Sequence, residues 1–393
     1  MDFEFTQAES AFRAELREFL DTEMEPWWRH IFANEERSTE AGLAMSAKLA
    51  ERGWLTMAWP REYGGSASSA WMQVVLREEM WSRGEPRGPQ YMNVNYIGPM
   101  IMTFGTEEQK QRFLTPMSEG RVLWCQGFSE PGAGSDLSAV STRARRVEGG
   151  YRVNGQKIWT SYADAPAQWC LLVVRTNPDV RRHQGISLLL VDMSLPGITV
   201  RPIDSLLGKG EINEVFFDDV LVPEDCRLGD EDAGWSMILA GLALERIGIP
   251  WYADAERFLD QLIAYANETI VDGRPLAQDP HIRTRIAELY VRCRAARLVS
   301  YRSVSLQEKG APSALESAAA WIHGGLLEQF AAQVGSEVTG PLGVLHRDDP
   351  DAEMDGWSEF QSMLSVPITI VAGTVDIQRN IVAQQGLGLP RGN

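Results

Sequence analysis

Residues 124–136 read W-C-Q-G-F-S-E-P-G-A-G-S-D. The first five residues are apolar or small enough to form a buried strand, and Pro131 cannot continue a hydrogen-bonded ladder. Gly132 and Gly134 let the backbone adopt positive φ and approach a ligand closely. Consecutive N–H groups beside the hydroxyl of Ser135 suit anionic oxygens. This stretch therefore predicts a strand ending in a ligand-binding turn, with a plain surface turn as the alternative.

A second stretch, residues 154–161, reads N-G-Q-K-I-W-T-S and predicts a turn at Asn154 and Gly155 before a strand that carries Trp159. Three more segments follow the same order along the chain: W-P-R-E-Y-G-G at 59–65, N-E-V-F-F-D-D-V at 213–220 and G-T-V-D-I-Q-R-N at 373–380. Together with S-E-P-G-A-G-S-D, this set resembles the acyl-CoA dehydrogenase family over nearly the whole chain. The resemblance implies an FAD-dependent enzyme.

Composition sets limits on partners and location. The chain has 393 residues, 44% hydrophobic content, a net charge of −17 and a pI of about 4.8. Such an acidic protein lacks the basic face that nucleic acids require. Four scattered cysteines and five isolated histidines give no metal-site spacing, and the acidic N-terminus and short apolar runs give no signal peptide or membrane span. We expect no metal, nucleic-acid or membrane binding and a cytoplasmic location.

The residue pattern predicts an α+β protein of three domains. Residues 1–122 read as an N-terminal all-α domain, and residues 123–232 contain short β-branched runs between turn signals, typical of an antiparallel β-domain. Residues 233–393 read as long helices joined by short loops, which indicates a four-helix bundle. The predicted strands are 151–153, 169–174, 186–191, 198–202 and 214–217.

Several helix boundaries are also predicted. Capping boxes are expected where Thr6 precedes Glu9, where Thr106 precedes Gln109 and where Ser313 precedes Glu316. Asp279 and Pro280 look like an N-cap followed by the first helical residue, and Gly310 looks like the end of that helix.

The acid–base residue is a point of departure from the family. By resemblance, the reaction removes a proton next to a thioester carbonyl while a hydride goes to flavin N5, and many members use a glutamate in a C-terminal E-G-T segment. Here the corresponding residue is Ala372. The substitute we predict is Glu245, which resembles the base of isovaleryl- and long-chain-type members. A structural glutamate paired with an arginine is the alternative.

The position of Glu245 supports that choice. It lies at helical spacing in an apolar stripe formed by Ile238, Leu242, Ile249 and Tyr252. Burial without a partner raises the pKa of a carboxyl group, which suits a base working near neutral pH. Pro250 predicts a kink just past it.

The resemblance also implies ligand contacts. Cofactor-binding residues are expected at Gln126, Phe128, Ser129, Gly134, Ser135, Trp159, Ser161, Gly373 and Thr374. Ser135, Arg246 and the N–H of Ala372 are expected to bind the acyl-CoA substrate, although for Arg246 a structural role is favoured.

The family's segments for the adenine half of FAD are altered. The R-x-x-F-G segment is replaced by T-I-V-D-G, with Thr269 and Asp272 at its key positions, and the Q-x-x-G-G segment is not recognisable in residues 336–343. A carboxylate near a pyrophosphate is repulsive. We therefore expect an α2β2-type heteromer in which a homologous chain supplies the missing groups, as in bacterial enzymes acting on steroid side chains. A homo-oligomer with rebuilt contacts is the alternative.

The leading functional hypothesis is α,β-dehydrogenation of an acyl-CoA with a bulky or branched acyl group such as a steroid side chain, with electrons passed to an electron-transfer flavoprotein. One alternative is an oxygen-using flavoprotein of the same fold. The other is a flavin-poor structural subunit that stabilises an active homologue, which the residues Thr269 and Ala372 favour and Glu245 opposes.

Overall fold

The computed structural model describes residues 4–33, 37–164, 167–208, 211–245, 251–311 and 313–390, without the side chains of residues 242–245. Packing divides the chain into two compact units. The bundle unit contains Met1–Ala33, Ser69–Glu85 and Arg246–Asn393, and the sheet unit contains Asn34–Ser68 and Pro86–Glu245. This division does not test the predicted boundaries at residues 122 and 232, which stay predictions.

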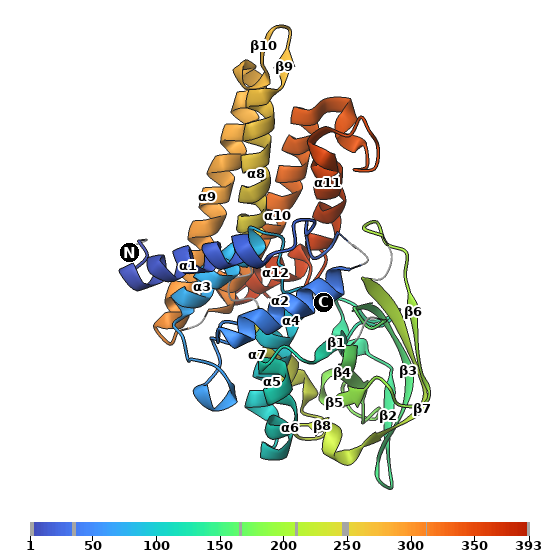
Figure 1. Cartoon of the computed structure of the whole chain (residues 1–393). Helices are drawn as coiled ribbons and strands as arrows, with labels where there is room; N and C mark the ends of the chain where they lie inside the picture. Colours follow the sequence, from blue (N-terminus) through green and yellow to red (C-terminus); the bar gives the residue numbers. More distant parts are fainter. Residues whose placement is uncertain are drawn as a thin grey trace. The chain divides into compact units, whose positions relative to one another are not determined.

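The bundle unit is built around helix α10 (Ala314–Thr339), which packs against α8, α9, α11 and α12 (Figure 1). The other elements of this unit are α1 (Gln7–Glu23), α3 (Ala70–Trp81), α8 (Trp251–Glu268), β9 (Ile270–Val271), β10 (Arg274–Pro275), η6 (Leu276–Gln278), α9 (Pro280–Glu308), η7 (Gly340–Val344), η8 (Glu353–Gly356), α11 (Trp357–Ile368), α12 (Val375–Ile381) and η9 (Val382–Gly386). The predicted bundle of long C-terminal helices is confirmed.

The ends of these helices follow most of the predicted capping signals, although at the predicted box of Ser313 and Glu316 the structure shows only the hydrogen bond from the Glu316 N–H to the Ser313 hydroxyl. Thr6 forms a reciprocal capping box at the start of α1, and Thr106 does so at the start of α6 (Glu107–Ser118) in the sheet unit. The carboxylate of Asp279 accepts hydrogen bonds from the first N–H groups of α9, and Pro280 is the first residue of that helix. Each cap satisfies N–H groups that have no partner within the helix.

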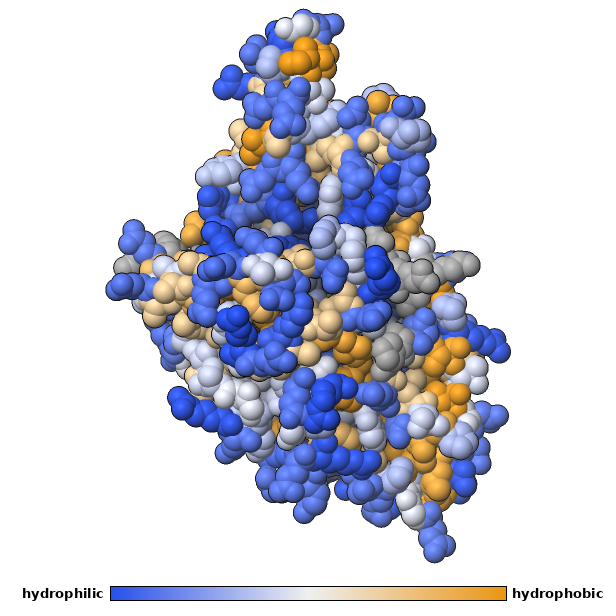
Figure 2. Space-filling model, viewed as in Figure 1, coloured by the Kyte–Doolittle hydropathy of each residue, from blue (hydrophilic) through white to orange (hydrophobic). Residues whose placement is uncertain are grey.

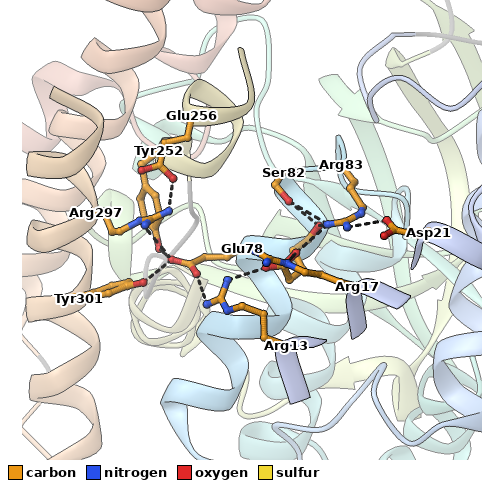
Figure 3. A network of polar contacts seen from close by, with 11 residues as sticks. Arg13, Arg17, Asp21, Glu78, Ser82, Arg83, Tyr252, Glu256, Arg297 and Tyr301 are labelled. Atoms are coloured by element: carbon orange, nitrogen blue, oxygen red, sulfur yellow. Dashed lines mark hydrogen bonds and ion pairs between the residues drawn. The ribbon is translucent and has the colours of Figure 1, made fainter. Parts of the chain in front are cut away.

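A buried carboxylate joins four helices of the bundle unit. Glu78 on α3 accepts hydrogen bonds from Tyr252 at the start of α8 and from Tyr301 on α9, while Arg13 on α1 donates to its other oxygen (Figure 3). The side chain of Glu78 is only 4% exposed. Because every oxygen has a donor, the charge is stabilised despite its burial.

The sheet unit contains an eight-stranded sheet in the order β6-β7-β3-β2-β4-β5-β8, with β1 also paired to β4. The strands are β1 (Leu123–Gly127), β2 (Arg143–Val147), β3 (Gly150–Ser161), β4 (Ala167–Arg175), β5 (Ile186–Asp192), β6 (Ile198–Pro202), β7 (Ile212–Pro223) and β8 (Arg227–Leu228). All five predicted strands lie within these ranges. The helices are α2 (Ser38–Glu51), η1 (Arg61–Tyr63), α4 (Gln90–Met92), η2 (Asn93–Ile97), α5 (Gly98–Phe104), α6, η3 (Leu137–Ala139), η4 (Arg182–Gln184), η5 (Glu224–Cys226) and α7 (Gly234–Glu245).

The sheet is mostly antiparallel, as predicted, but β1 runs parallel to β4. Parallel strands are usually covered on both faces, and β1 fits this rule because Trp124 and Cys125 are fully buried. Strand β1 is therefore buried, and the chain passes directly from its C-terminal end into the turn at residues 128–135.

The predicted turn at Asn154 and Gly155 is wrong. Strand β3 continues through both residues, and the pairing with β7 shifts register there, so the dipeptide forms a β-bulge. Gly155 has φ +152°, and a Cβ atom there would lie 2.6 Å from the Cα of Thr142. A glycine is needed at this position for close approach inside a sheet, which is a different use of the same dipeptide.

The surface is largely polar, and Figure 2 shows hydrophobic residues over part of the sheet unit and at the β9–β10 hairpin, where Ile270 is 60% exposed and Val271 45% exposed. Among the described helices, none combines the length and apolarity that crossing a membrane requires. The four cysteines are free thiols, and all are buried.

Candidate active site

The turn after β1 is closed by its own backbone. The N–H of Glu130 donates to the carbonyl of Ala133 at 2.9 Å, and the N–H of Ala133 donates back at 3.0 Å. Gly132 and Gly134 lie on the exposed side of this turn, and a Cβ atom on either would meet nothing within 4 Å. Ser135 follows and is also exposed.

The positive φ expected at these two glycines is wrong. Neither Gly132 nor Gly134 is among the described glycines with positive φ. The two backbone hydrogen bonds between Glu130 and Ala133 close the turn without a left-handed residue. The glycines instead leave the outer side of the turn without side chains, so its backbone is open to approach from solvent.

The end of β3 is the second part of the site. The N–H of Ile158 donates to the carbonyl of Ser129 at 3.0 Å, so β3 lies directly beside the residues that leave β1. Trp159 follows with φ +61° and 57% exposure, and Tyr162 has φ +59°. Left-handed backbone at two bulky residues is costly. Here it turns a large aromatic ring outward on one side of Ser161.

Several buried polar atoms around these strands have no hydrogen-bond partner among the described residues. They are Trp124 Nε1, Gln126 Nε2, Thr160 Oγ1 and Asn213 Oδ1. An unpaired buried polar group costs about 1–3 kcal/mol, so such atoms call for a bound molecule or water. Gln126 is on β1 and was predicted from the sequence, whereas the other three were not.

A buried ion pair supports the turn and was missed by the sequence reasoning. Lys157 on β3 is 0% exposed, and its ammonium donates to Glu130 Oε1 at 2.8 Å and to the carbonyl of Phe128 at 3.0 Å. The other oxygen of Glu130 accepts from the N–H and hydroxyl of Ser141. Both charged residues were present in the two quoted motifs, but nothing in their spacing indicated that they pair.

The electrostatics of this pair are strongly perturbed. Burial alone would raise the pKa of Glu130, but the charge of Lys157 and several hydrogen bonds lower it to about 2. Burial lowers the pKa of Lys157 to about 8, against the opposing effect of Glu130. A second carboxyl near this strand end, that of Glu211, has its pKa raised to about 7 by burial.

The C-terminal segment belongs to the bundle unit. Ala372 has φ +49° and Gly373 has φ +95°, so the chain makes a left-handed turn before α12. The hydroxyl oxygen of Thr374 caps that helix by accepting from the N–H of Ile377 at 3.1 Å. Its hydrogen remains available to donate to a ligand.

The predicted base ends a helix. Glu245 is the last residue of α7, but its side chain lies outside the described residues, as do Arg246, Ile249 and Pro250. Within the described part of the predicted stripe, Ile238 is fully buried on α7 and Tyr252 is buried on α8. The expected burial of the Glu245 carboxylate and the kink at Pro250 therefore stay predictions.

The structure brings one group of predicted residues together within the sheet unit. Gln126, Phe128 and Ser129 adjoin the strand end that carries Trp159 and Ser161, and Gly134 and Ser135 follow the same turn. Ala372, Gly373 and Thr374 form a separate group within the bundle unit.

Comparison with known proteins identifies related sequences across the chain. The sequence patterns described as "Acyl-CoA dehydrogenase, N-terminal domain", "middle domain" and "C-terminal domain" match residues 6–121, 125–220 and 232–387. "Acyl-CoA dehydrogenase IpdE1" of Mycobacterium tuberculosis is 35% identical over 365 residues, covering 91% of this chain and 90% of that protein. "Acyl-CoA dehydrogenase FadE26" of the same organism is 32% identical, with full coverage of both chains.

Solved structures are similar over the full length. A chain of the ChsE4-ChsE5 complex from Mycobacterium tuberculosis superimposes with a TM-score of 0.91 at 32% identity, covering 100% of both chains. A chain of the structure titled "Tcur3481-Tcur3483 steroid ACAD" gives a TM-score of 0.89 at 30% identity, also with full coverage.

Proposed function

This chain belongs to the acyl-CoA dehydrogenase family and is an acyl-CoA dehydrogenase, and from this premise we propose that it uses FAD to introduce an α,β double bond into a bulky acyl-CoA. The observation that carries the proposal is the hydrogen bond from Ile158 to the carbonyl of Ser129, which joins the two motif segments beside the exposed ring of Trp159. An aromatic face next to backbone donors suits a flat, polar-edged cofactor.

The residues present fit FAD. The buried side-chain nitrogen of Gln126 has no partner in the described chain, and Trp159 exposes a ring surface at the cost of a left-handed backbone. Gln126, Phe128 and Ser129 would hold the pyrimidine end of the isoalloxazine, and Trp159 and Ser161 would contact the ring system. The Ser135 hydroxyl, beside Gly134, would reach the pyrophosphate. By the family resemblance, Gly373 and Thr374 would contact the ribityl–pyrophosphate region. When bound, FAD supplies the acceptor for the hydride that leaves the β-carbon.

Glu245 is the base in this proposal. Its carboxylate would take the proton from the α-carbon, and the N–H of Ala372 would donate to the thioester carbonyl and stabilise the charge that develops there. Ser135 would contact the substrate's pantetheine, and Arg246 would support the base. Proton removal requires a desolvated carboxylate close to the α-carbon. The apolar residues around α7 would exclude water from that carboxylate.

The test is substitution of Glu245 by Gln. Retained flavin with turnover reduced about 100- to 10,000-fold is the expected result, because general-base catalysis contributes about that factor. Glu268→Gln is the matched control, since Glu268 is an exposed glutamate at the end of α8. Unchanged turnover in Glu245→Gln would exclude the base assignment and favour the alternative of a structural subunit.

We also propose a heteromeric assembly with a homologous partner. Thr269 precedes the β9–β10 hairpin, and Asp272 occupies its turn with φ +52°, so the residues at the family's adenine-binding positions offer no cation there. Both solved relatives described above are named as two-component proteins. Flavin content should rise when the chain is co-purified with its partner, whereas full occupancy in the chain alone would support a homo-oligomer.

The proposed acyl group takes its support from the name given to one of these relatives. One is titled a steroid enzyme, so we propose a steroid side chain carried as a CoA thioester, with an electron-transfer flavoprotein as the acceptor. A panel of acyl-CoA thioesters should bleach the flavin selectively when the acyl group is bulky. Fast reoxidation of the reduced enzyme in air would instead favour the oxygen-using alternative.

A further inference from the structure

The two peptide groups that flank Ser129 are each held by a hydrogen bond to the carbonyl oxygen. The carbonyl of Phe128 accepts from the Lys157 ammonium at 3.0 Å, and the carbonyl of Ser129 accepts from the N–H of Ile158 at 3.0 Å. The Phe128 carbonyl and the Ser129 N–H belong to the same peptide unit. A hydrogen bond to the carbonyl therefore polarises the N–H and makes it a stronger donor.

The donor behind Phe128 is an unusual choice. Lys157 is wholly buried, and burial of an ammonium costs several kcal/mol unless it is paired. A neutral donor could satisfy the same carbonyl without that cost. The pairing carboxylate is also held rigidly, because Glu130 accepts from Ser141 at 2.6 Å and from the Thr142 N–H at 2.9 Å. The fold thus provides two fixed acceptors for the ammonium at this place, the Glu130 carboxylate and the Phe128 carbonyl.

The aliphatic part of Lys157 passes under β1. A Cβ atom at Gly127 would lie 3.5 Å from the Lys157 Cγ, and it would also lie 2.7 Å from Leu172 and 2.9 Å from the Cys170 sulfur. Glycine at the end of β1 is therefore required by the close approach of Leu172 and Cys170, and the Lys157 chain lies beside it at ordinary contact distance. The strand end, the lysine and the turn form one packed arrangement.

We propose that Lys157 is a positioning residue for bound FAD, which acts through the Phe128–Ser129 peptide to strengthen the Ser129 N–H as a donor to the pyrimidine end of the isoalloxazine and so raises the reduction potential of the cofactor. The proposal rests on the proposed function, because it takes Ser129 to face the flavin. A stronger donor at that end favours the reduced form, which is richer in negative charge than the oxidised form.

The charge on Lys157 should make this effect depend on pH. The groups that face its ammonium are Glu130 beyond β1 and the Cys170 thiol on β4, and Arg175 interacts with Glu130 in turn. Burial lowers the pKa of Lys157 to about 8, while Glu130 raises it. Above pH 8 the lysine loses its proton, so the stabilisation of reduced flavin should fade. Without Glu130 the same loss should occur at lower pH.

The test compares variants that keep the packing but change the charge. In Lys157→Met/Glu130→Gln both charges are removed together, so no buried ion is left unpaired. Lys157→Arg keeps the positive charge, and Lys309→Met is the control for an exposed lysine. The midpoint potential of bound FAD is measured by dye equilibration from pH 6 to pH 9 in the complex that carries flavin, together with the FAD dissociation constants.

The double variant should bind reduced FAD about tenfold more weakly relative to oxidised FAD at pH 7, which is the loss expected for one charge-assisted contact. Its difference from wild type should shrink above pH 8. In Glu130→Gln that decline should begin at lower pH, and Lys157→Arg and Lys309→Met should keep the wild-type potential.

A folded double variant with the wild-type potential throughout this pH range would overturn the role of Lys157, even if acyl-CoA still bleaches the flavin and the proposed function stands. Should the double variant retain no FAD, Glu130→Gln decides: a pH profile identical to that of wild type overturns the proposal. If the wild-type complex binds no FAD, the proposed function itself fails, and the inference fails with it.

Discussion

Replacing Glu78 should reveal how much one buried carboxylate contributes to the bundle unit. Its Oε1 accepts from the hydroxyls of Tyr252 at 2.8 Å and Tyr301 at 2.7 Å, and its Oε2 accepts from Arg13 at 2.5 Å (Figure 3). These donors come from three different helices. In Glu78→Gln the charge is lost, and one amide position becomes a donor that faces other donors.

The magnitude follows from which groups lose their partner. Arg13 retains Glu79, whose Oε1 lies 2.7 Å away, so its charge stays paired. The hydroxyls of Tyr252 and Tyr301 are buried, at 3% and 5% exposure of their residues, and lose a charged acceptor. Hydrogen bonds to charged groups contribute about 1.5–3 kcal/mol each, so the free energy of unfolding should fall by about 3–5 kcal/mol.

The assay is urea denaturation followed by circular dichroism at pH 7, with Glu18→Gln as the control for an exposed glutamate on α1. A triple variant, Glu78→Leu with Tyr252→Phe and Tyr301→Phe, removes the carboxylate and both hydroxyls together. It should be more stable than Glu78→Gln, because both tyrosine hydroxyls are removed together with their acceptor, while Arg13 keeps Glu79 and Arg297 keeps Glu256 as partners. The reasoning would be refuted if Glu78→Gln matched the control or if the triple variant were the least stable of the three.

Three further predictions concern single positions. Burial lowers the pKa of His30 to about 4, although the nearby Asp254 opposes this shift. The free energy of unfolding of the wild type should therefore fall by up to about 3 kcal/mol as the pH falls from about 6.5 to 4, and urea titrations should show a smaller fall for His30→Gln. Burial raises the pKa of Glu211 to about 7, so its protonated form stabilises the fold below pH 4.5 and this contribution is lost as the pH rises to 7. At pH 8, thermal melts should show that Glu211→Gln is more stable than the wild type by on the order of 2 kcal/mol, a value reduced to allow for the partial exposure of Glu211. Gly65→Ala places a Cβ atom 2.0 Å from the carbonyl oxygen of Trp59 and should cost about 1–3 kcal/mol or more by calorimetry, whereas Gly132→Ala, which meets nothing within 4 Å, should cost little.

Local signals were the part of the fold that the sequence predicted best. The cap at Thr6 involves only Thr6 and the next three residues, so the sequence shows it directly. The strand at 186–191 is likewise recognisable from the apolar residues of that segment alone. The Asn154 and Gly155 pair looked equally local but was misread as a turn. Its role as a bulge depends on Thr142, thirteen residues before Gly155, whose backbone leaves no room for a side chain at Gly155.

The candidate site was predictable only where a known family motif indicated which residues lie close together. The approach of Ser129 to Ile158 joins two motifs through residues that lie 29 positions apart in the sequence, and the resemblance supplied that link. The ion pair between Glu130 and Lys157 spans 27 positions, but no periodic pattern or known motif spacing indicated it. Long-range pairing of buried charges depends on tertiary packing, which no local propensity encodes.

In the proposed site, Ala372 would lack the carboxylate side chain used by many family members and would keep the N–H donor. A left-handed φ of +49° is unfavourable for alanine by about 1 kcal/mol or more, and glycine would relieve it. The turn nevertheless persists, because Val375 donates to the carbonyl of Thr369 at 3.0 Å and Gln378 donates to the carbonyl of Gly373 at 3.2 Å. One of these hydrogen bonds spans residue 372 and the other holds the residue after it, and neither uses the side chain at 372. A base supplied by that side chain and a donor supplied by that N–H are therefore independent properties of the same position, and the base can move to α7 without disturbing the donor.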